Sequence, residues 1–226
     1  MNFIVIEGLD GAGKSTQIKL LKKYFTDQGH KPEYLHFPRT DSPYFGYLIA
    51  RFLRGEFGSI NDVDPYLVAM LYAGDRKDAA ALISRWLSNG KMVILDRYTY
   101  SNIAYQCAKL DSDVARENLK KWILDLEFRH FGIPEPDLNI FLDVPFIFTQ
   151  NKLSKTRNGN DRSYLNGQSD IHESSLDFQS RVRDIYLEVA GSDKKLRIVN
   201  CNDKSGGMLP PGDIFGLILG LIKQTK

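Results

Sequence analysis

The segment Gly8-Leu9-Asp10-Gly11-Ala12-Gly13-Lys14-Ser15 constrains the fold of this chain most, because it fits the pattern G-x-x-x-x-G-K-[ST] without a mismatch. It follows an apolar run at 3–6 and precedes a stretch whose apolar residues recur at helical spacing. Glycines let backbone N–H groups line an anion-binding concavity, and the next helix presents its positive N-terminus to the same anion. The segment predicts a strand, a phosphate-binding loop and a helix, with Lys14 on the β- and γ-phosphates and Ser15 on Mg²⁺.

Strands and helices are predicted to alternate along the rest of the chain. Apolar runs predict strands at 33–37, 91–96, 138–143 and 196–199, and helical patterns cover about 44–89, 101–131, 174–189 and 211–223. Asp64-Pro65 signals a new helix start inside the first helical stretch, because proline suits the first turn of a helix. This alternation favours an α/β fold with a parallel sheet and helices on both faces, in a single domain over 1–226.

A polar segment at 152–172 interrupts this pattern. It is rich in Lys, Arg, Asn, Gly and Ser and poor in apolar residues. A loop of about twenty residues in a compact domain is usually a functional lid or is disordered.

Two clusters follow predicted strands, Phe37-Pro38-Arg39 and Asp96-Arg97-Tyr98, and a third, Tyr72 to Arg76, lies in the helical stretch at 44–89. In an open α/β sheet, ligands bind beyond the carboxyl ends of the strands. The three arginines at 39, 76 and 97 can therefore converge near the phosphate loop. Arginine binds phosphate bidentately and keeps its charge, which suits a monophosphate dianion.

Aromatic and polar side chains in and beside these clusters suit a nucleotide. Phe37 and Tyr72 offer flat faces for a base, and Asn102 and Tyr105 offer polar groups for sugar and base edges. Two alternatives stay open at this point: Arg76 lies on a solvated helix face, or Tyr72 belongs to the core.

An aspartate at a strand end is the expected partner of Mg²⁺ or of its water. Asp96 and Asp143 both end predicted strands. We favour Asp96 because it is adjacent to Arg97.

Composition excludes several classes of protein. The chain has 226 residues, 30 Lys and Arg against 28 Asp and Glu, and a net charge of +2, whereas a nucleic-acid binder usually shows a stronger basic excess. No apolar run approaches the roughly 20 residues that span a bilayer, and no export signal is visible, so we expect a cytoplasmic protein without a membrane or nucleic-acid partner. Cys107 and Cys201 are too few for a disulfide framework.

From about residue 2 to about 200 the sequence resembles the thymidylate kinases. The resemblance is carried by 95–106 (LDRYTYSNIAYQ), 7–16 (EGLDGAGKST), 37–39 (FPR) and 134–137 (PEPD). It implies a three-layer P-loop fold with a five-stranded parallel sheet and a flexible lid. It also implies the reaction ATP + dTMP → ADP + dTDP in dTTP biosynthesis, dependence on Mg²⁺, and a homodimer.

The resemblance also implies residue roles. The ATP-binding loop runs from Gly8 through Thr16, and the metal side comprises Asp10, Ser15 and Asp96. On the acceptor side, Tyr72 stacks on thymine, Arg76 and Asn102 contact the base, Arg39 and Arg97 hold the phosphate, and Tyr105 crowds the sugar 2′ position. Asp10 approaches the sugar 3′-hydroxyl, and the substrate set is completed by Phe37, Asp170 and Glu173. The catalytic set is Lys14, Asp96, Arg97, Arg157 and Arg162.

Two positions depart from the family's pattern. Some members have an arginine in the phosphate loop where this chain has Gly11. The family's alternative is to supply catalytic arginines from the lid, where this chain has Arg157 and Arg162. The alternative is that both belong to a solvated basic loop. His172 replaces an aromatic residue that often precedes the glutamate matching Glu173.

Alternative functions share the phosphate loop. A kinase for another monophosphate fits the same residues, and a deoxynucleoside kinase would need a carboxylate base, for which Glu7 is the candidate. A non-catalytic nucleotide-binding module is a further class. A guanine-specific switch is disfavoured because the sequence lacks an Asn-Lys-x-Asp motif.

Overall fold

The structure, a computed structural model, describes residues 1–145, 148, 164–165, 170–172 and 175–225. Its strands are β1 (Phe3–Glu7), β2 (Glu33–His36), β3 (Val93–Asp96), β4 (Leu138–Asp143) and β5 (Leu196–Asn200). Its helices are α1 (Lys14–Asp27), α2 (Phe45–Leu53), α3 (Pro65–Ser88), α4 (Thr99–Cys107), α5 (Asp113–Leu124), the π-helical η1 (Asp125–His130), α7 (Leu176–Ser192) and α8 (Pro211–Gln224). Among these residues, no helix combines the length and apolar character needed to cross a membrane.

The strands of the described chain form one parallel sheet in the order β2-β3-β1-β4-β5. In its register Ile6 lies opposite Asp96, and Asp96 lies opposite His36. The carboxyl ends of β1, β2 and β3 therefore meet at one edge, where the phosphate loop leaves β1. This arrangement agrees with the predicted five-stranded parallel sheet.

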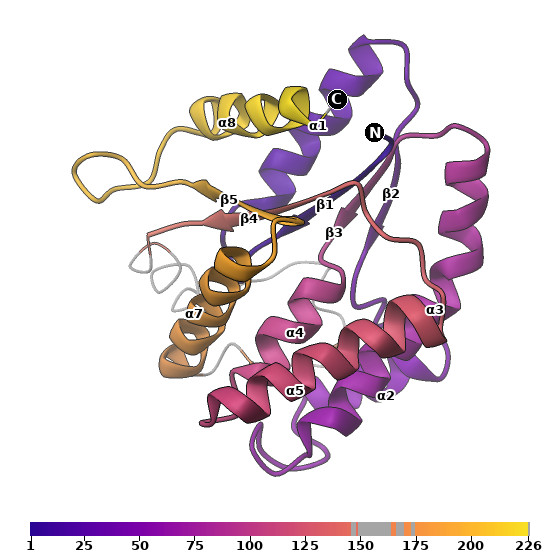
Figure 1. Cartoon of the computed structure of the whole chain (residues 1–226), viewed down its shortest axis with the longest axis vertical. Helices are drawn as coiled ribbons and strands as arrows, with labels where there is room; N and C mark the ends of the chain where they lie inside the picture. The colour runs from indigo at the N-terminus through magenta and orange to yellow at the C-terminus, as the bar shows by residue number, and fades with distance from the viewer. Residues whose placement is uncertain (146–147, 149–163, 166–169, 173–174, 226) are drawn as a thin grey trace.

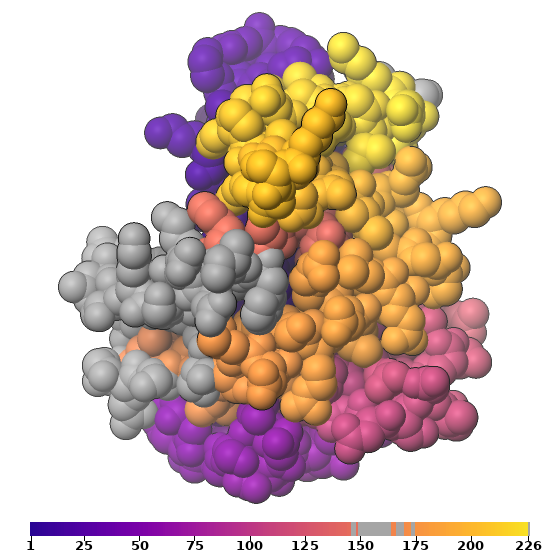
Figure 2. All heavy atoms as spheres, turned by 90° about the vertical axis from the view of Figure 1, so that its left-hand side faces the viewer, coloured from indigo at the N-terminus to yellow at the C-terminus, as the bar shows by residue number. Residues whose placement is uncertain are grey.

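Helices cover both faces of the sheet, which gives three layers (Figure 1). On one face, Ile4 and Ile6 pack with apolar residues of α1 and α8. On the other, Phe3 and Val5 pack with α3, while Phe141 of β4 packs with α4, α5 and α7. Figure 2 shows α8 in yellow above α7 in orange on one side of the molecule.

The helix predictions are confirmed at most positions. Asp64 caps α3 by accepting from the N–H groups of Tyr66 and Leu67, and proline occupies the first turn. The helical pattern predicted over 101–131 comprises α4, α5 and η1 rather than one helix, because the chain turns after Cys107 and Ser112 caps α5. Most of the predicted lid at 152–172 lies outside the described residues.

Candidate active site

The phosphate loop joins the end of β1 to the start of α1. Gly11 and Gly13 adopt left-handed backbone conformations, with φ of 79° and 82°, which residues with a Cβ rarely adopt. The Lys14 side chain folds back over the loop, and its Nζ donates to the carbonyls of Gly8 at 3.2 Å and Leu9 at 3.0 Å. The ammonium group is thus held inside the loop, next to the N-terminus of α1.

Arg97 occupies a strained turn between β3 and α4. Its φ is 67°, in the left-handed region that side chains other than glycine seldom occupy. Its backbone N–H donates to the carbonyl of Ile6 at 2.9 Å, which continues the ladder between β3 and β1. The side chain is consequently directed from the sheet edge toward the phosphate loop.

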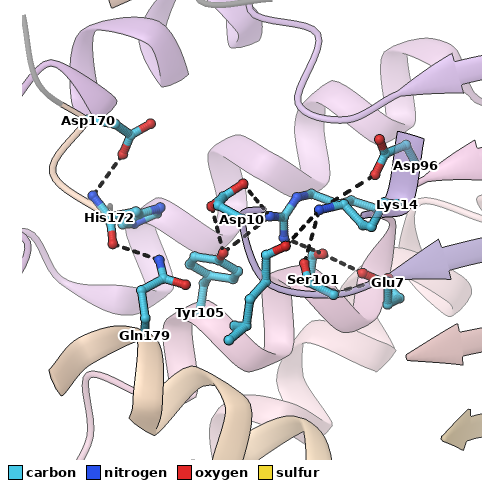
Figure 3. A network of polar contacts seen from close by, with 12 residues as sticks. Glu7, Asp10, Lys14, Asp96, Ser101, Tyr105, Asp170, His172 and Gln179 are labelled. Carbon is cyan, nitrogen blue, oxygen red and sulfur yellow. Dashed lines mark hydrogen bonds and ion pairs between the residues drawn. The ribbon is translucent and has the colours of Figure 1, made fainter. Parts of the chain in front are cut away.

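The Arg97 guanidinium contacts Asp10 and Tyr105 (Figure 3). Its Nη2 donates to Asp10 Oδ1 at 2.8 Å and to the Tyr105 hydroxyl at 3.3 Å, and that hydroxyl donates to Asp10 Oδ2 at 3.1 Å. Burial opposes the charged form of Asp10, but Arg97 and then Lys14 outweigh it and hold the pKa of Asp10 well below its usual range. Asp10 is therefore an anion that orients Arg97.

Asp96 lies between the Lys14 ammonium group and the His36 imidazole. Its Oδ1 lies 4.0 Å from Lys14 Nζ, and its Oδ2 lies 3.3 Å from His36 Nδ1. Burial raises the pKa of Asp96, but Lys14 and His36 outweigh it, so that the pKa stays below its usual value. The alternative aspartate, Asp143, forms a bidentate ion pair with Arg183 at 2.6 and 2.9 Å.

Arg39 is held by carboxylates of α3. Its Nε donates to Asp75 Oδ1 at 2.9 Å, and its Nη2 donates to the Asp75 carbonyl at 2.8 Å and to Asp78 Oδ2 at 3.0 Å. The guanidinium also lies over the ring of Phe37, which is itself only 1% exposed. These contacts fix the position of Arg39 at the end of β2.

Arg76 is buried, so the alternative interpretation, in which it lies on a solvated helix face, is wrong. Its Nε and Nη2 donate to the two carboxylate oxygens of Glu127 at 2.6 Å each. Burial lowers the pKa of Arg76, but Glu127 more than compensates and the pKa lies above its usual value. Glu127 also accepts from the Thr99 hydroxyl at 2.8 Å and from Asn102 Nδ2 at 3.0 Å.

A cavity of about 630 Å³ opens at this edge of the sheet. It brings together eleven of the residues singled out from the sequence, Asp10, Ser15, Phe37, Arg39, Tyr72, Arg76, Asp96, Arg97, Asn102, Tyr105 and Asp170. The other loop residues, Gly8, Leu9, Gly11, Ala12, Gly13, Lys14 and Thr16, are not part of its lining. Arg157, Arg162 and Glu173 lie outside the described residues. Tyr72 is partly buried and lines the cavity rather than belonging only to the core.

His172 lies beside Tyr105, with ring centroids 5.0 Å apart (Figure 3). Its backbone N–H donates to Asp170 Oδ1 at 2.8 Å, and its carbonyl accepts from Gln179 Nε2 at 2.7 Å. Burial, with smaller contributions from Lys109 and Arg97, lowers the pKa of His172 to about 3. The imidazole is therefore neutral at physiological pH.

Comparison with known proteins identifies the family. The family model described as thymidylate kinase matches residues 6–206, most of the chain. The chain belongs to the thymidylate kinase family. It is 37% identical over 230 residues to a probable thymidylate kinase of Thermococcus gammatolerans, covering 98% of this chain and 96% of the relative. It is 32% identical over 187 residues to the thymidylate kinase of Mycobacterium tuberculosis, covering 83% of this chain and 85% of that one.

A solved structure gives the same fold. The thymidylate kinase of Candida albicans matches with a TM-score of 0.70 at 26% identity, covering 98% of this chain and 90% of that chain. The similarity to these three proteins covers between 83% and 98% of this chain.

Several residues that line the cavity of this thymidylate kinase family member were not predicted from the sequence as site residues. His36, Ser101 and Gln106 line the cavity. The strand-end rule could have indicated His36, and Ser101 and Gln106 fall inside the family motif at 95–106. Glu127, which fixes Arg76, stands in a stretch without any motif.

Proposed function

We propose that the chain transfers the γ-phosphoryl group of ATP to dTMP, giving ADP and dTDP for dTTP synthesis. The observation that carries this proposal is the cavity in which the phosphate loop faces the three arginines at 39, 76 and 97. A triphosphate on the loop and a monophosphate on Arg97 would meet at one edge of the sheet. The family membership supports ATP and dTMP as the two substrates.

The contacts suggest that different residues bind the phosphate, the base and the sugar of the acceptor. Arg97 and Arg39, at the ends of β3 and β2, hold the acceptor phosphate, and their carboxylate partners fix the direction of each guanidinium. Arg76, on α3, contacts the base, and Tyr72 of the same helix stacks on it. Tyr105 stands at the sugar, beside Asp10.

Asn102, Asp170 and Phe37 complete the acceptor side of the proposed site. Asn102 Oδ1 is buried without a hydrogen-bond partner among the described residues, which suits a donor on the base edge. We keep Glu173, with Asp170, on the sugar side of the proposed site.

The donor set suits Mg²⁺ as the reaction's metal. Asp96 Oδ1 is buried and has no hydrogen-bond partner among the described residues, and Ser15 and Asp10 line the same cavity with further oxygens. Within the described ranges, no three carboxylate, imidazole or thiol groups form a metal cage, and Mg²⁺ is usually bound through one or two carboxylates plus substrate phosphates. When bound, the ion neutralises charge on the transferring phosphates.

The residues act by positioning and by charge. The acceptor phosphate dianion is already a nucleophile, so no general base is required. Lys14 and Arg97 stabilise charge on the transferred group in a partly desolvated site, where preorganised charges act strongly. We assign the remaining cationic help to Arg157 or Arg162, because Gly11 leaves the phosphate loop without an arginine at that position.

A deoxynucleoside acceptor is disfavoured by the surroundings of Glu7. Its carboxylate is fully buried, is not part of the cavity lining, and accepts hydrogen bonds from Tyr98, Ser101 and Tyr186. It is therefore unavailable as a base for a 5′-hydroxyl. A non-catalytic module is disfavoured by Asp96 and Arg97 on the cavity lining, with Lys14 Nζ 4.0 Å from Asp96 Oδ1.

Three further expectations belong to this proposal. We propose that the enzyme is a homodimer; Leu67 and Met70 on α3 are exposed and would suit a contact between two copies. The absence of a nucleic-acid partner and a cytoplasmic location stay predictions from the sequence.

A coupled assay tests the acceptor. Purified enzyme with ATP and Mg²⁺ is given dTMP, dUMP, UMP or thymidine, and kcat/KM is compared. The panel matters because the Candida albicans relative has broad substrate specificity. We expect dTMP to be the best acceptor; turnover of thymidine without turnover of dTMP would refute the proposal.

A further inference from the structure

Glu7 forms the centre of a buried polar network behind the cavity. It is the last residue of β1 and is 0% exposed. Its Oε1 accepts from the backbone N–H of Tyr98 at 2.9 Å and of Ser101 at 3.3 Å. Its Oε2 accepts from the Ser101 hydroxyl and from the Tyr186 hydroxyl at 3.0 Å. A buried carboxylate needs such donors, since an unpaired buried charge is costly.

The first contacts make Glu7 the N-terminal cap of α4. Tyr98 is the N-cap residue of this helix and provides no side-chain cap of its own. The N–H groups of Tyr98 and of the first turn would lack partners, and Glu7 satisfies two of them from 91 and 94 residues away in sequence. Its negative charge also lies at the positive end of the helix dipole. Glu7 therefore fixes where α4 begins relative to β1.

The same network extends to the side chain of Arg97. The Ser101 hydroxyl, held by Glu7, lies 3.3 Å from Arg97 Nη1, while Nη2 of the same guanidinium binds Asp10. In Figure 3, Ser101 lies between Glu7 on one side and Asp10 with Tyr105 on the other. Arg97 itself occupies the left-handed backbone conformation directly before the capped turn. Glu7 thus supports both the backbone after Arg97 and one edge of its guanidinium.

We infer that Glu7 is a positioning residue for Arg97, which through Ser101 and the capped start of α4 sets the direction of the guanidinium in the acceptor site. The inference rests on the proposed function, in which Arg97 holds the acceptor phosphate. Glu7 itself is fully buried and does not line the cavity. Its loss should therefore affect the monophosphate more than ATP.

The test compares Glu7→Gln with Tyr186→Phe and Tyr100→Phe. The first two variants weaken the network, and Tyr100→Phe removes a hydroxyl of the same helix, α4, that donates instead to Asp193 at 2.5 Å. For each variant, kcat, the KM values for dTMP and ATP, the Kd for dTMP and the unfolding midpoint are measured. Because misplacement by about 1 Å can cost about 10²-fold in rate, we expect Glu7→Gln to lower kcat/KM for dTMP by about that factor. The KM for ATP should change by no more than about three-fold, and Tyr186→Phe should show a smaller loss of the same kind.

Two results would overturn the inference. In the first, Glu7→Gln lowers the unfolding midpoint but changes the KM for dTMP and the KM for ATP by the same factor, as expected of a purely structural residue. In the second, which decides the matter if Glu7→Gln does not fold, Tyr186→Phe has the same dTMP parameters as Tyr100→Phe. If the wild-type chain prefers another monophosphate, the variants are measured with that acceptor, so failure of the proposed substrate and failure of this inference stay distinguishable.

Discussion

The ion pair between Arg76 and Glu127 allows a quantitative test of the cavity's architecture. The two side chains are 1% and 0% exposed, and two bonds of 2.6 Å join them. Removing one partner of a buried pair leaves the other charge uncompensated, which typically costs about 3–5 kcal/mol. We therefore expect Glu127→Gln to lower the free energy of unfolding by about that amount. Thr99 and Asn102, which also donate to Glu127, lose part of their shared acceptor in this variant.

A double-mutant cycle separates this pair from general damage to the core. Arg76→Met and Glu127→Gln are made singly and together, and guanidinium unfolding is followed by circular dichroism and by tryptophan fluorescence. In the double variant neither charge stays buried, so the two effects should fall short of additivity by about 2–3 kcal/mol. Arg76→Met should also raise the KM for dTMP more than the KM for ATP.

An exposed ion pair provides the matched control. Lys23 and Asp27 lie four residues apart on α1, with side chains 73% and 61% exposed. Asp27→Asn should cost less than about 1 kcal/mol. If Glu127→Gln costs no more than Asp27→Asn, or if the cycle is additive within about 0.5 kcal/mol, the reasoning about a desolvated pair is refuted.

Three further predictions concern the metal, the catalytic cation and pH. Asp96→Asn should raise the Mg²⁺ concentration for half-maximal rate by about ten-fold or more, and Asp143→Asn should not; equal effects in a Mg²⁺ titration would contradict the assignment. Arg157→Ala or Arg162→Ala should lower kcat by on the order of 10³ with little change in KM, and full kcat in both would place the catalytic cation elsewhere. Burial lowers the pKa of Lys109 to about 7, so the folded state disfavours its charge, and stability should rise as pH increases from about 7 toward 10. Lys109→Met should remove this rise in unfolding experiments at pH 7 and 9.5, whereas an unchanged slope would exclude Lys109 as its source.

The sequence contained enough information to predict the strands, because each corresponds to a short segment rich in apolar residues. The segments at 3–6, 138–143 and 196–199 predicted β1, β4 and β5 to within about two residues. The strand order was not predictable in the same way. Pairing of β1 with both β3 and β4 depends on contacts between segments about 90 and 135 residues apart, which leave no local pattern.

The break between α4 and α5 shows where periodicity misleads. Apolar residues recur at helical spacing on both sides of 108–112, so the pattern continues through a turn. Ser112 accepts from the N–H of Ala115, and this N-cap was the local signal for a new helix. A rule that weighs caps as strongly as periodicity would have divided the segment there.

The strand-end rule placed Asp96 and Arg97 beside the phosphate loop, because the carboxyl ends of parallel strands share one edge. It could not assign their partners. From the sequence alone, a solvated position for Arg76 stayed an open alternative. The structure shows that Arg76 is buried because it pairs with Glu127, 51 residues away. Partners that come from a remote helix depend on tertiary packing, which local residue types do not encode.

The charge balance of the cavity follows from these partners. Each principal cation has its own carboxylate, in the pairs Arg97 with Asp10, Arg39 with Asp75, Arg76 with Glu127 and Lys14 with Asp96. In the proposed function, a monophosphate would enter a site whose described residues are already close to neutral, so that long-range attraction from them would contribute little to its capture. What the carboxylates provide is orientation, because a guanidinium held by two or three bonds needs little rearrangement when the transferred group develops charge. In the proposed function, a near-neutral chain would in this way bind two highly charged substrates, and the direction of each cation, rather than the number of cations, would determine which phosphate it contacts.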